Sequence, residues 1–225
     1  MPKRKGPQPN HMYEKQLYNQ GYRHILGMDE AGRGAWAGPV SVGAVCLPLG
    51  LKDLRKQLPE VRDSKIMTPL QRERMVEKIK EYAVAWGVGS ASNSEIDELG
   101  INPATRLAMQ RALDDAHKRF PKFKPDCLFL DAMIWPEKLR EYPQITMVDG
   151  DARSFTVAAA SIIAKTWRDQ IMRDLDEELP QYNFGTHKGY GTGSHHSALK
   201  TYGLSPFHRT SYAPIRKLIQ QGNGD

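Results

Sequence analysis

The sequence has few of the features that mark secreted and membrane proteins. Its 225 residues include only two cysteines, Cys46 and Cys127, each inside an apolar run. We interpret them as small core residues in a reducing cytosol, because two such cysteines form neither a disulfide framework nor a zinc site. No apolar run approaches the ~18 residues of a membrane-spanning helix. The amino terminus also lacks the apolar core of a signal peptide. We therefore expect a cytoplasmic protein that is not associated with a membrane.

Signatures of nucleotide cofactors and of structural zinc are also missing. The sequence has no GxxxxGKS loop and no dinucleotide-binding glycine fingerprint. Most histidines fall late in the chain, and their spacing gives no zinc pattern with the cysteines. There is no internal repeat. These absences are compatible with a single globular domain that acts as an enzyme or as a binding module.

Composition and charge set the size and the class of partner. The length corresponds to one large domain, and a hydrophobic content of 40% is enough for a buried core. The net charge is +6, which is compatible with a polyanionic partner but does not identify one. We expect a disordered basic arm over residues 1–12, a single domain over 13–215 and a polar tail over 216–225.

Alternating and continuous apolar runs predict five strands separated by helices. We expect the first three strands to form an antiparallel meander, because their connections are short, and the last two to need crossovers. This order predicts an α/β domain with a mixed five-stranded sheet flanked by helices, followed by a largely irregular C-terminal segment with one or two short helices. The expected strands are 25–28, 40–47, 83–90, 126–131 and 144–148, and the main helices are 13–22, 69–82, 102–120 and 154–178.

Two adjacent carboxylates, Asp29 and Glu30, end the first apolar strand and precede Gly32-Arg33-Gly34. On a regular strand they would point to opposite faces, so we expect the strand to end there and the backbone to turn. Paired carboxylates suit a hard cation such as Mg²⁺, and a Gly-Arg-Gly turn offers N–H groups and a guanidinium to phosphate. The alternative is a strand end with solvated charges.

Two further carboxylates fall where later strands end. Asp131 closes the fourth strand, and Asp151 follows the fifth. Strand ends of an open sheet often meet at one ligand site, so four carboxylates there would hold two Mg²⁺ or Mn²⁺ ions. Asp151 is alternatively the N-cap of the next helix, and Asp131 a simple strand end. Asp149 competes with Asp151, since both face one side of an extended chain.

The C-terminal region carries two segments that combine basic and aromatic residues. Residues 186–193 contain Lys188, which suits a phosphate, and Tyr190, which suits stacking on a sugar or base. Residues 207–212 repeat the theme around Arg209. Each segment taken alone is equally typical of a glycine-rich surface loop.

The ordered motifs together resemble ribonuclease HII from about residue 23 to 215. The resemblance rests on the acidic pair with its Gly-Arg-Gly turn and on motifs that follow in the same order along most of the chain. These motifs are Asp63-Ser64-Lys65, Leu130-Asp131, Gly150-Asp151, residues 158–165 with Arg168-Asp169, residues 187–192, and His208-Arg209 with Ser211-Tyr212. The resemblance implies an RNase H-like fold with a C-terminal extension of helices and loops.

The resemblance also implies a function and a set of site residues. It implies a metal-dependent endonuclease that cuts RNA in RNA–DNA hybrids and incises 5′ of single ribonucleotides embedded in DNA, as in ribonucleotide repair. The metal ligands and catalytic residues would be Asp29, Glu30, Asp131 and Asp151, with Mn²⁺ or Mg²⁺ as the cofactor. The substrate-binding residues would be Gly32, Arg33, Gly34, Ser64, Lys65, Lys188, Tyr190 and Arg209.

Two positions depart from the family pattern. Asp149 stands where the family usually has lysine, and Ala132 where it usually has glycine. The first change adds negative charge near the expected metal site. Other hypotheses are a binding domain that has lost activity, and a DNA-cutting transposase or resolvase. The acidic set weighs against the former, and the context of Gly-Arg-Gly and Tyr190 against the latter. We expect a monomer whose protein partner, if any, is unknown.

Overall fold

The computed structural model describes residues 9–50, 53–131, 141–147 and 149–222. Its centre is a five-stranded sheet of order β3-β2-β1-β4-β5. The strands are β1 (Ile25–Ala31), β2 (Val40–Cys46), β3 (Ala85–Ala91), β4 (Cys127–Asp131) and β5 (Gln144–Met147). β1, β2 and β3 pair antiparallel, whereas β4 and β5 run parallel to β1. The predicted mixed sheet and its opening meander are therefore confirmed.

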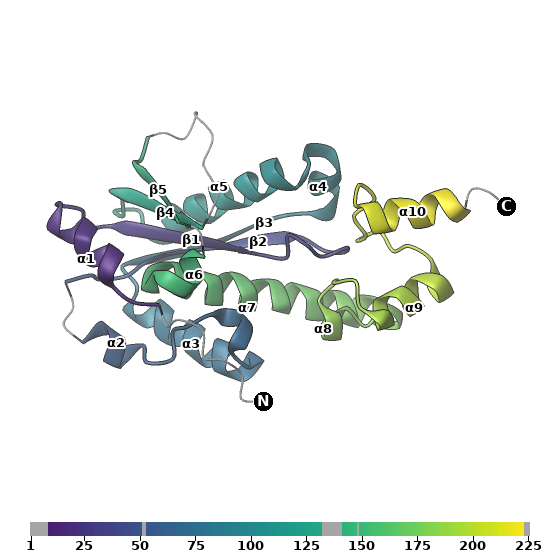
Figure 1. The fold of residues 1–225 in the computed structure, drawn as a ribbon, viewed down its shortest axis with the longest axis horizontal. Coiled ribbons are helices and arrows are strands. Elements are labelled where there is room, and N and C mark those ends of the chain that lie inside the picture. Colours follow the sequence, from purple (N-terminus) through teal and green to yellow (C-terminus); the bar gives the residue numbers. More distant parts are fainter. Residues whose placement is uncertain (1–8, 51–52, 132–140, 148, 223–225) are drawn as a thin grey trace.

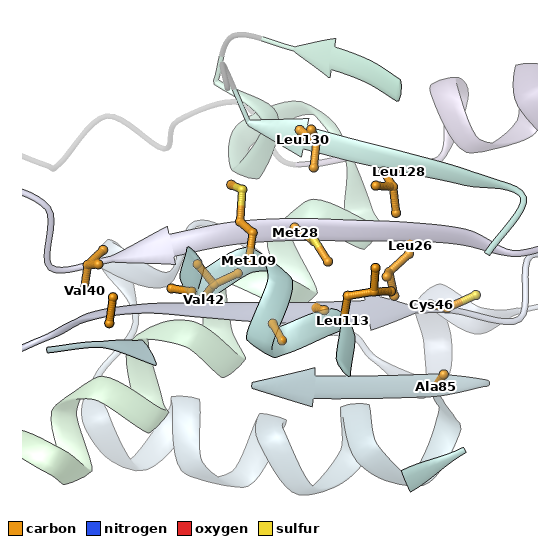
Figure 2. Packing of buried hydrophobic residues seen from close by; sticks show 14 of the residues in the cluster. Leu26, Met28, Val40, Val42, Cys46, Ala85, Met109, Leu113, Leu128 and Leu130 are labelled. Carbon is orange, nitrogen blue, oxygen red and sulfur yellow. The ribbon is translucent and has the colours of Figure 1, made fainter. Parts of the chain in front are cut away.

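Helices cover both faces of this sheet (Figure 1). On one face lies α5 (Ile101–Arg119), which follows the short α4 (Asn93–Leu99) and carries the chain across to β4. On the other face lie α7 (Phe155–Glu178) and α3 (Pro69–Tyr82). Figure 2 shows how Met109 and Leu113 of α5 pack over side chains of β1, β2 and β4. The result is a three-layer domain with a core on each side of the sheet.

Glycines bring these helices unusually close to the sheet. A Cβ on Gly43 of β2 would lie 2.4 Å from the carbonyl oxygen of Ala160 in α7. On the opposite face, a Cβ on Gly89 of β3 would lie 2.2 Å from the carbonyl oxygen of Ala108 in α5. Real atoms never approach so closely, so the two layers require glycine in the strand and small residues in the helix.

Local capping explains where the main helices begin. Thr68 and Gln71 form the capping box of α3, with Pro69 at its first position as predicted. Ser154 accepts the N–H of Val157 and caps α7. The short helix α6 (Gly150–Arg153) precedes it and contains Asp151. The alternative that Asp151 caps the long helix is therefore wrong, because Ser154 occupies that position.

The ends of the domain differ from the prediction. Residues 1–8 of the expected arm lie outside the described residues, but Asn10 forms a bridge with Ser154 and α1 (Met12–Asn19) begins before residue 13. At the other end, α10 (Ala213–Gly222) runs through most of the expected polar tail. The segment after α7 also holds α8 (Phe184–His187) and α9 (Gly193–Tyr202). This is one helix more than the one or two expected.

Three short pieces complete the description. The helix α2 (Leu54–Gln57) and the 3₁₀ turn η1 (Ser64–Ile66) connect β2 to α3, and a second 3₁₀ turn, η3 (Pro180–Tyr182), follows α7. In Figure 1, α8, α9 and α10 lie beyond one end of the sheet. None of the helices in the described ranges is long and apolar enough to cross a membrane.

Candidate active site

Asp29 and Glu30 lie within β1, not beyond its end. They pair with Gly43 and Val42 of β2, and the strand continues through Ala31. The expectation that the strand stops at this pair is therefore wrong. Alternation along β1 places Asp29 on the face of α7 and Glu30 on the face of α5. Both still line one cavity of about 490 Å³, because they lie near the carboxyl end of β1, where the cavity reaches both faces of the sheet.

Asp151 is brought to the same place by α6. Its exposed fraction is 6%, the same as that of Asp29. The ammonium of Lys65, which lines the cavity, lies 3.1 Å from Oδ2 of Asp151. Burial tends to lower the pKa of Lys65, but the hydrogen bond and charge of Asp151, together with the charges of Asp63 and Asp29, outweigh it and raise that pKa. Lys65 thus lies in the combined field of three carboxylates from different parts of the chain.

Asp149 does not share this environment. It is exposed and takes the left-handed conformation, with φ of 56°, directly before α6. The backbone therefore turns between Asp149 and Asp151 instead of running extended, and the two carboxylates do not share one face. Between the two candidates for the fourth position, the buried Asp151 is the one that meets Lys65.

Asp131 is placed by its backbone. β4 runs parallel to β1 with Met28 opposite Leu130, so the next step of the register sets Asp131 beside Asp29. On its other side, Asp131 pairs with Met147 of β5. The side chain of Asp131 lies outside the described residues. Among the side chains that are described, no three histidine, cysteine or acidic residues come close enough together to hold a metal ion.

The residues present nevertheless fit a hard divalent cation. Asp29 and Asp151 are buried carboxylates, and Glu30 is paired with the guanidinium of Arg33 at 3.1 Å. The side chains of the two neighbouring cations are exposed, 75% for Lys65 and 39% for Arg33. Each pair joins an exposed cation to a largely buried carboxylate, so both cations are able to turn into solvent when another cation binds the carboxylates. Carboxylate oxygens are the ligands that Mg²⁺ and Mn²⁺ prefer.

The Gly-Arg-Gly turn borders the carboxylates and is held from behind. Gly32 has φ of 93°, and a Cβ there would lie 1.9 Å from Nε of Arg168. The carbonyl oxygen of Arg33 accepts hydrogen bonds from Nη1 of Arg209, at 2.9 Å, and from the hydroxyl of Tyr212. The turn is therefore a fixed element of the cavity wall.

Arg209 is a support for this turn and does not meet solvent. Its exposed fraction is 0%, and its Nε donates to the carbonyl of Gly38 at 2.9 Å. Burial lowers the pKa of its guanidinium. The prediction that Arg209 contacts substrate is therefore corrected, because the side chain is buried beneath the turn. Its effect on a bound nucleic acid has to pass through the main chain of Arg33.

Tyr190 stands across the cavity from the turn. Its ring is exposed at 38%, and a Cβ on Gly34 would lie 4.0 Å from Cε1 of that ring. The ammonium of Lys165 lies 6.0 Å from the ring centroid, and the guanidinium carbon of Arg168 lies 5.6 Å from it. The aromatic ring and the glycine thus face one another in the cavity, with positive charge close to the ring.

Lys188 is not brought to the cavity. Its ammonium donates to the main-chain carbonyls of Gly185 and Asp169, and burial lowers its pKa. The prediction that Lys188 meets a phosphate in this cavity is therefore not supported by its position. Besides Lys65, the cavity is lined by Lys165, which sequence reasoning missed as a site residue. The available signal was its spacing, since Ser161, Lys165 and Asp169 recur every four residues on one face of α7.

Ser64 lies on the cavity wall, as predicted for a site residue, but its side chain is buried. Its Oγ lies 2.9 Å from Oγ of Ser161, and Arg72 donates to its carbonyl oxygen at 3.1 Å. Arg72 also pairs with Asp169 at 2.8 Å, and Asp169 binds Lys165 at 2.7 Å. This buried network joins η1 to α7 and fixes Lys65 and Lys165 on the same wall.

Comparisons with known proteins agree with this arrangement. The family model described as Ribonuclease HII matches residues 26–215. Ribonuclease HII of Roseiflexus castenholzii is 47% identical over 94% of this chain and 91% of its own length. Ribonuclease HII of Dehalococcoides mccartyi is 44% identical over 94% and 95%. The crystal structure of ribonuclease H2 from Pyrococcus horikoshii superposes with a TM-score of 0.71 at 26% identity, covering 90% of this chain and all of that one.

The match covers both halves of the site, since the sheet edge with its carboxylates and the segment of Tyr190 lie within residues 26–215. The same fold in a solved relative confirms the RNase H-like architecture expected from the sequence. The chain belongs to the ribonuclease HII family, and it is a ribonuclease H-type nuclease that acts on RNA–DNA hybrids.

Proposed function

We propose that this enzyme hydrolyses the phosphodiester on the 5′ side of a ribonucleotide, both in RNA–DNA hybrids and where one ribonucleotide is embedded in duplex DNA. The products would carry 5′-phosphate and 3′-hydroxyl ends. The observation that carries the proposal is that one cavity is lined by the acidic pair Asp29 and Glu30, by the Gly-Arg-Gly turn and by Tyr190. Hydrolysis and recognition of the sugar then occur within the reach of one nucleotide.

The carboxylates would hold two divalent ions. Asp29 and Asp151 supply buried oxygens on one face of the sheet, Glu30 supplies oxygens on the other, and Asp131 comes from the neighbouring strand. Such a pair of ions activates water and stabilises the leaving 3′ oxygen when bound. Lys65 and Arg33 would exchange their carboxylate partners for phosphate oxygens as the ions and the substrate enter. We expect both Mg²⁺ and Mn²⁺ to support the reaction.

The main chain of the Gly-Arg-Gly turn would sense the ribose 2′-hydroxyl. Because the described peptide bonds are all trans, the N–H of Gly34 points away from the carbonyl of Arg33. That carbonyl points inward, to Arg209 and Tyr212. The N–H of Gly34 is therefore directed to the cavity side, where it is placed to donate to a 2′-hydroxyl, the group that distinguishes RNA from DNA.

Tyr190 would test the nucleotide that follows. Its ring faces Gly34 and lies close to Lys165 and Arg168. Stacking on a deoxyribose is favoured there, whereas a second 2′-hydroxyl would crowd the ring. Lys165 and Lys65 are the cavity lysines in reach of the neighbouring phosphates. The two contacts together favour the junction between a ribonucleotide and the deoxynucleotide after it.

Cleavage of three matched duplexes tests the proposal. The duplexes are all DNA, DNA with one ribonucleotide, and a long RNA–DNA hybrid, each assayed with Mg²⁺, with Mn²⁺ and with a chelator. We expect cleavage of the two ribonucleotide-containing duplexes, 5′ of the ribonucleotide and only with metal. Cleavage of the all-DNA duplex, or activity in the chelator, would contradict the proposal.

The variant Asp131→Asn tests the placement of the fourth strand's carboxylate. We expect it to lose cleavage but to keep binding of the duplex, because removal of one negative charge weakens the metal pair while it reduces repulsion of phosphate. The dissociation constant for the single-ribonucleotide duplex and the cleavage rate are measured side by side. Near wild-type cleavage at ordinary Mg²⁺ would show that Asp131 is not a ligand.

A further inference from the structure

A chain of buried histidines lies behind Tyr190 and has no part in the proposed chemistry. His195 of α9 is 0% exposed and His208 is 2% exposed. Their Nε2 atoms lie 3.0 Å apart, and Nδ1 of His195 lies 3.0 Å from the carbonyl oxygen of Tyr190. The two imidazoles therefore connect the C-terminal segment to the main chain of the tyrosine that faces the Gly-Arg-Gly turn.

The hydrogen bonds determine where each proton resides. The backbone N–H of Ser205 donates to Nδ1 of His208 at 2.9 Å, so this nitrogen carries no proton. The carbonyl of Ser205, at 3.3 Å, is more distant and does not change the assignment. The proton of neutral His208 is then on Nε2 and is donated to Nε2 of His195. The proton of His195 must be on Nδ1, where it is donated to the carbonyl of Tyr190.

Neighbouring groups keep both rings neutral. His187 stacks on His195 with ring centroids 4.3 Å apart, and its Nε2 donates to the carbonyl of Tyr182 at 2.7 Å. Its Nδ1 accepts the N–H of Gly189. Burial lowers the pKa of His195 and His208 to about 4, although the backbone contact of His195 with Tyr190 and that of His208 with Ser205 act to raise it. The direction of the chain, from Ser205 to Tyr190, is therefore preserved at neutral pH.

The contact with Tyr190 is not the only bond to its carbonyl. The N–H of Thr192 donates to the same oxygen at 2.8 Å. Loss of the bond from His195 would therefore leave the Tyr190 carbonyl with one donor, Thr192. The orientation of the peptide group at Tyr190 would then be less tightly fixed. The rotation so permitted would move the ring relative to Gly34, where an added Cβ would lie 4.0 Å from Cε1 of the ring. This predicts a change in discrimination that is larger than the change in stability.

We propose that His195 is a positioning residue for Tyr190 and that His208 holds it in the required tautomer. The pair sets the angle of the tyrosine ring, and so the preference for a ribonucleotide followed by a deoxynucleotide. This inference rests on the proposed contact of Tyr190 with the junction. Neither histidine is expected to touch the substrate, because both are buried.

Two amide substitutions separate this role from simple packing. In His195→Asn, the amide nitrogen falls near the position of Nδ1 and can still donate to Tyr190, although the side chain leaves a gap. In His195→Gln, the amide nitrogen falls near the position of Nε2 and the gap is smaller, but the bond to Tyr190 is lost. A packing role makes Gln the milder change, whereas a positioning role makes Asn the milder one.

The measured quantity is kcat/KM on the single-ribonucleotide duplex divided by kcat/KM on a long hybrid. We expect His195→Gln to lower this ratio by about threefold to tenfold, the range that one lost hydrogen bond implies. His195→Asn should stay within about twofold of wild type. His196→Gln, the same change at the exposed neighbouring histidine, is the matched control and should not alter the ratio. Thermal melts confirm that all three variants fold. A ratio that falls equally in both His195 variants, or more in Asn, would overturn the inference.

A Tyr190→Ala background separates failure of this inference from failure of the proposed function. If Tyr190 reads the junction, its removal lowers the ratio and the His195 variants then add nothing. If Tyr190→Ala leaves the ratio unchanged, the junction contact is wrong. Positioning is then judged by the NMR shifts of a selectively labelled Tyr190 ring. These shifts should move in His195→Gln and not in His195→Asn, and the reverse would overturn the inference.

Discussion

Cationic side chains are exposed at the acidic cavity but buried in the block behind it. The block consists of Arg168 and Arg209 with the main-chain carbonyls that they bind. At the cavity, Asp151 and Glu30 pair with the exposed cations Lys65 and Arg33. In the block, Arg168 is fully buried and donates to the carbonyls of Pro39, Lys188 and Ala37. Arg209, also fully buried, binds carbonyls of the turn. Both regions are ionic, but only the first meets water.

This difference separates groups that exchange partners from groups that do not. An exposed ion pair contributes about 0–1 kcal/mol, so metal ions and phosphates can replace Lys65 and Arg33 at little cost. A buried guanidinium that loses its carbonyls leaves unsatisfied groups, each of which costs about 1–3 kcal/mol. The cavity is therefore suited to chemistry and the block to geometry. Substitutions in the cavity should lower activity with little change in the free energy of unfolding. Substitutions in the block should chiefly lower the free energy of unfolding.

The largest effect is expected at the buried carboxylate of the cavity. Asp151→Asn should lower kcat by at least about 10²-fold, because it removes charge that holds the metal ions. Stability should change by less than about 1 kcal/mol, since its partner Lys65 is exposed. Asp149→Asn, the matched control, should stay near wild type. Cleavage rates across a metal titration are measured for both variants. A larger loss in Asp149→Asn than in Asp151→Asn would show that Asp149 is the ligand.

The two glycines of the turn should differ in how much an added methyl group destabilises the protein. Gly32→Ala forces a Cβ into Arg168 and strains a residue with positive φ, so we expect a loss of roughly 2–5 kcal/mol in unfolding free energy. Gly34→Ala meets only Tyr190 at 4.0 Å and should cost less than about 1 kcal/mol.

Urea denaturation of both variants, with cleavage assays on the same samples, measures this contrast. Gly34→Ala should still lower kcat/KM by about tenfold or more, because the added methyl group lies on the side where the main chain meets the sugar. Equal stability losses in the two variants would mean that Arg168 adjusts to the added methyl group and is not a rigid support.

Tyr190 lies between the cavity and the block behind it. Its replacement by alanine should lower activity less than Asp151→Asn does. Tyr190→Ala should lose roughly 1–3 kcal/mol of transition-state binding on the single-ribonucleotide duplex, the usual scale of an aromatic stack. The loss on a long hybrid should be smaller. Parallel kinetics on the two substrates decide the matter. An equal loss on both would assign Tyr190 to general binding.

The last contrast concerns pH. Because the pKa values of His195 and His208 are lowered to about 4, the unfolded chain binds protons between pH 6.5 and 4 that the native protein does not. Stability should be complete above pH 6.5 and fall toward pH 4, by at most about 1.4 kcal/mol per pH unit for each histidine. Glu95, whose pKa is lowered to about 2 chiefly by its hydrogen bond with Arg111, acts at lower pH.

Urea denaturation from pH 7.5 to 4.5 measures this slope. His195→Asn should make the slope shallower, because it removes one of the two groups, whereas His196→Gln should leave it unchanged. A slope in His195→Asn as steep as in wild type would show that the buried histidines do not account for the loss of stability.

Local rules account for what the sequence determined by itself. Alternating and continuous apolar runs predicted the five strands, and the helix expected over 69–82 is α3, because side-chain periodicity and capping depend on neighbours a few residues apart. The sequence likewise predicted that Asp29, Glu30 and Asp151 lie close together, although the first two stand inside β1 and Asp151 is carried by α6. Their roles as metal ligands remain predictions.

Only the tertiary structure decided which cations face the cavity. Lys188 and Arg209 look as available in the sequence as Lys165. The carbonyls of Gly185 and Asp169 nevertheless bind Lys188, those of Gly38 and Arg33 bind Arg209, and Lys165 is left beside Tyr190. The direction of the Arg33 carbonyl depends on Arg209, far along the chain, and the tautomer of His195 depends on His208, whereas Ser205 sets the tautomer of His208 locally. Burial makes these choices, because a polar group removed from water takes whichever partner the fold places beside it.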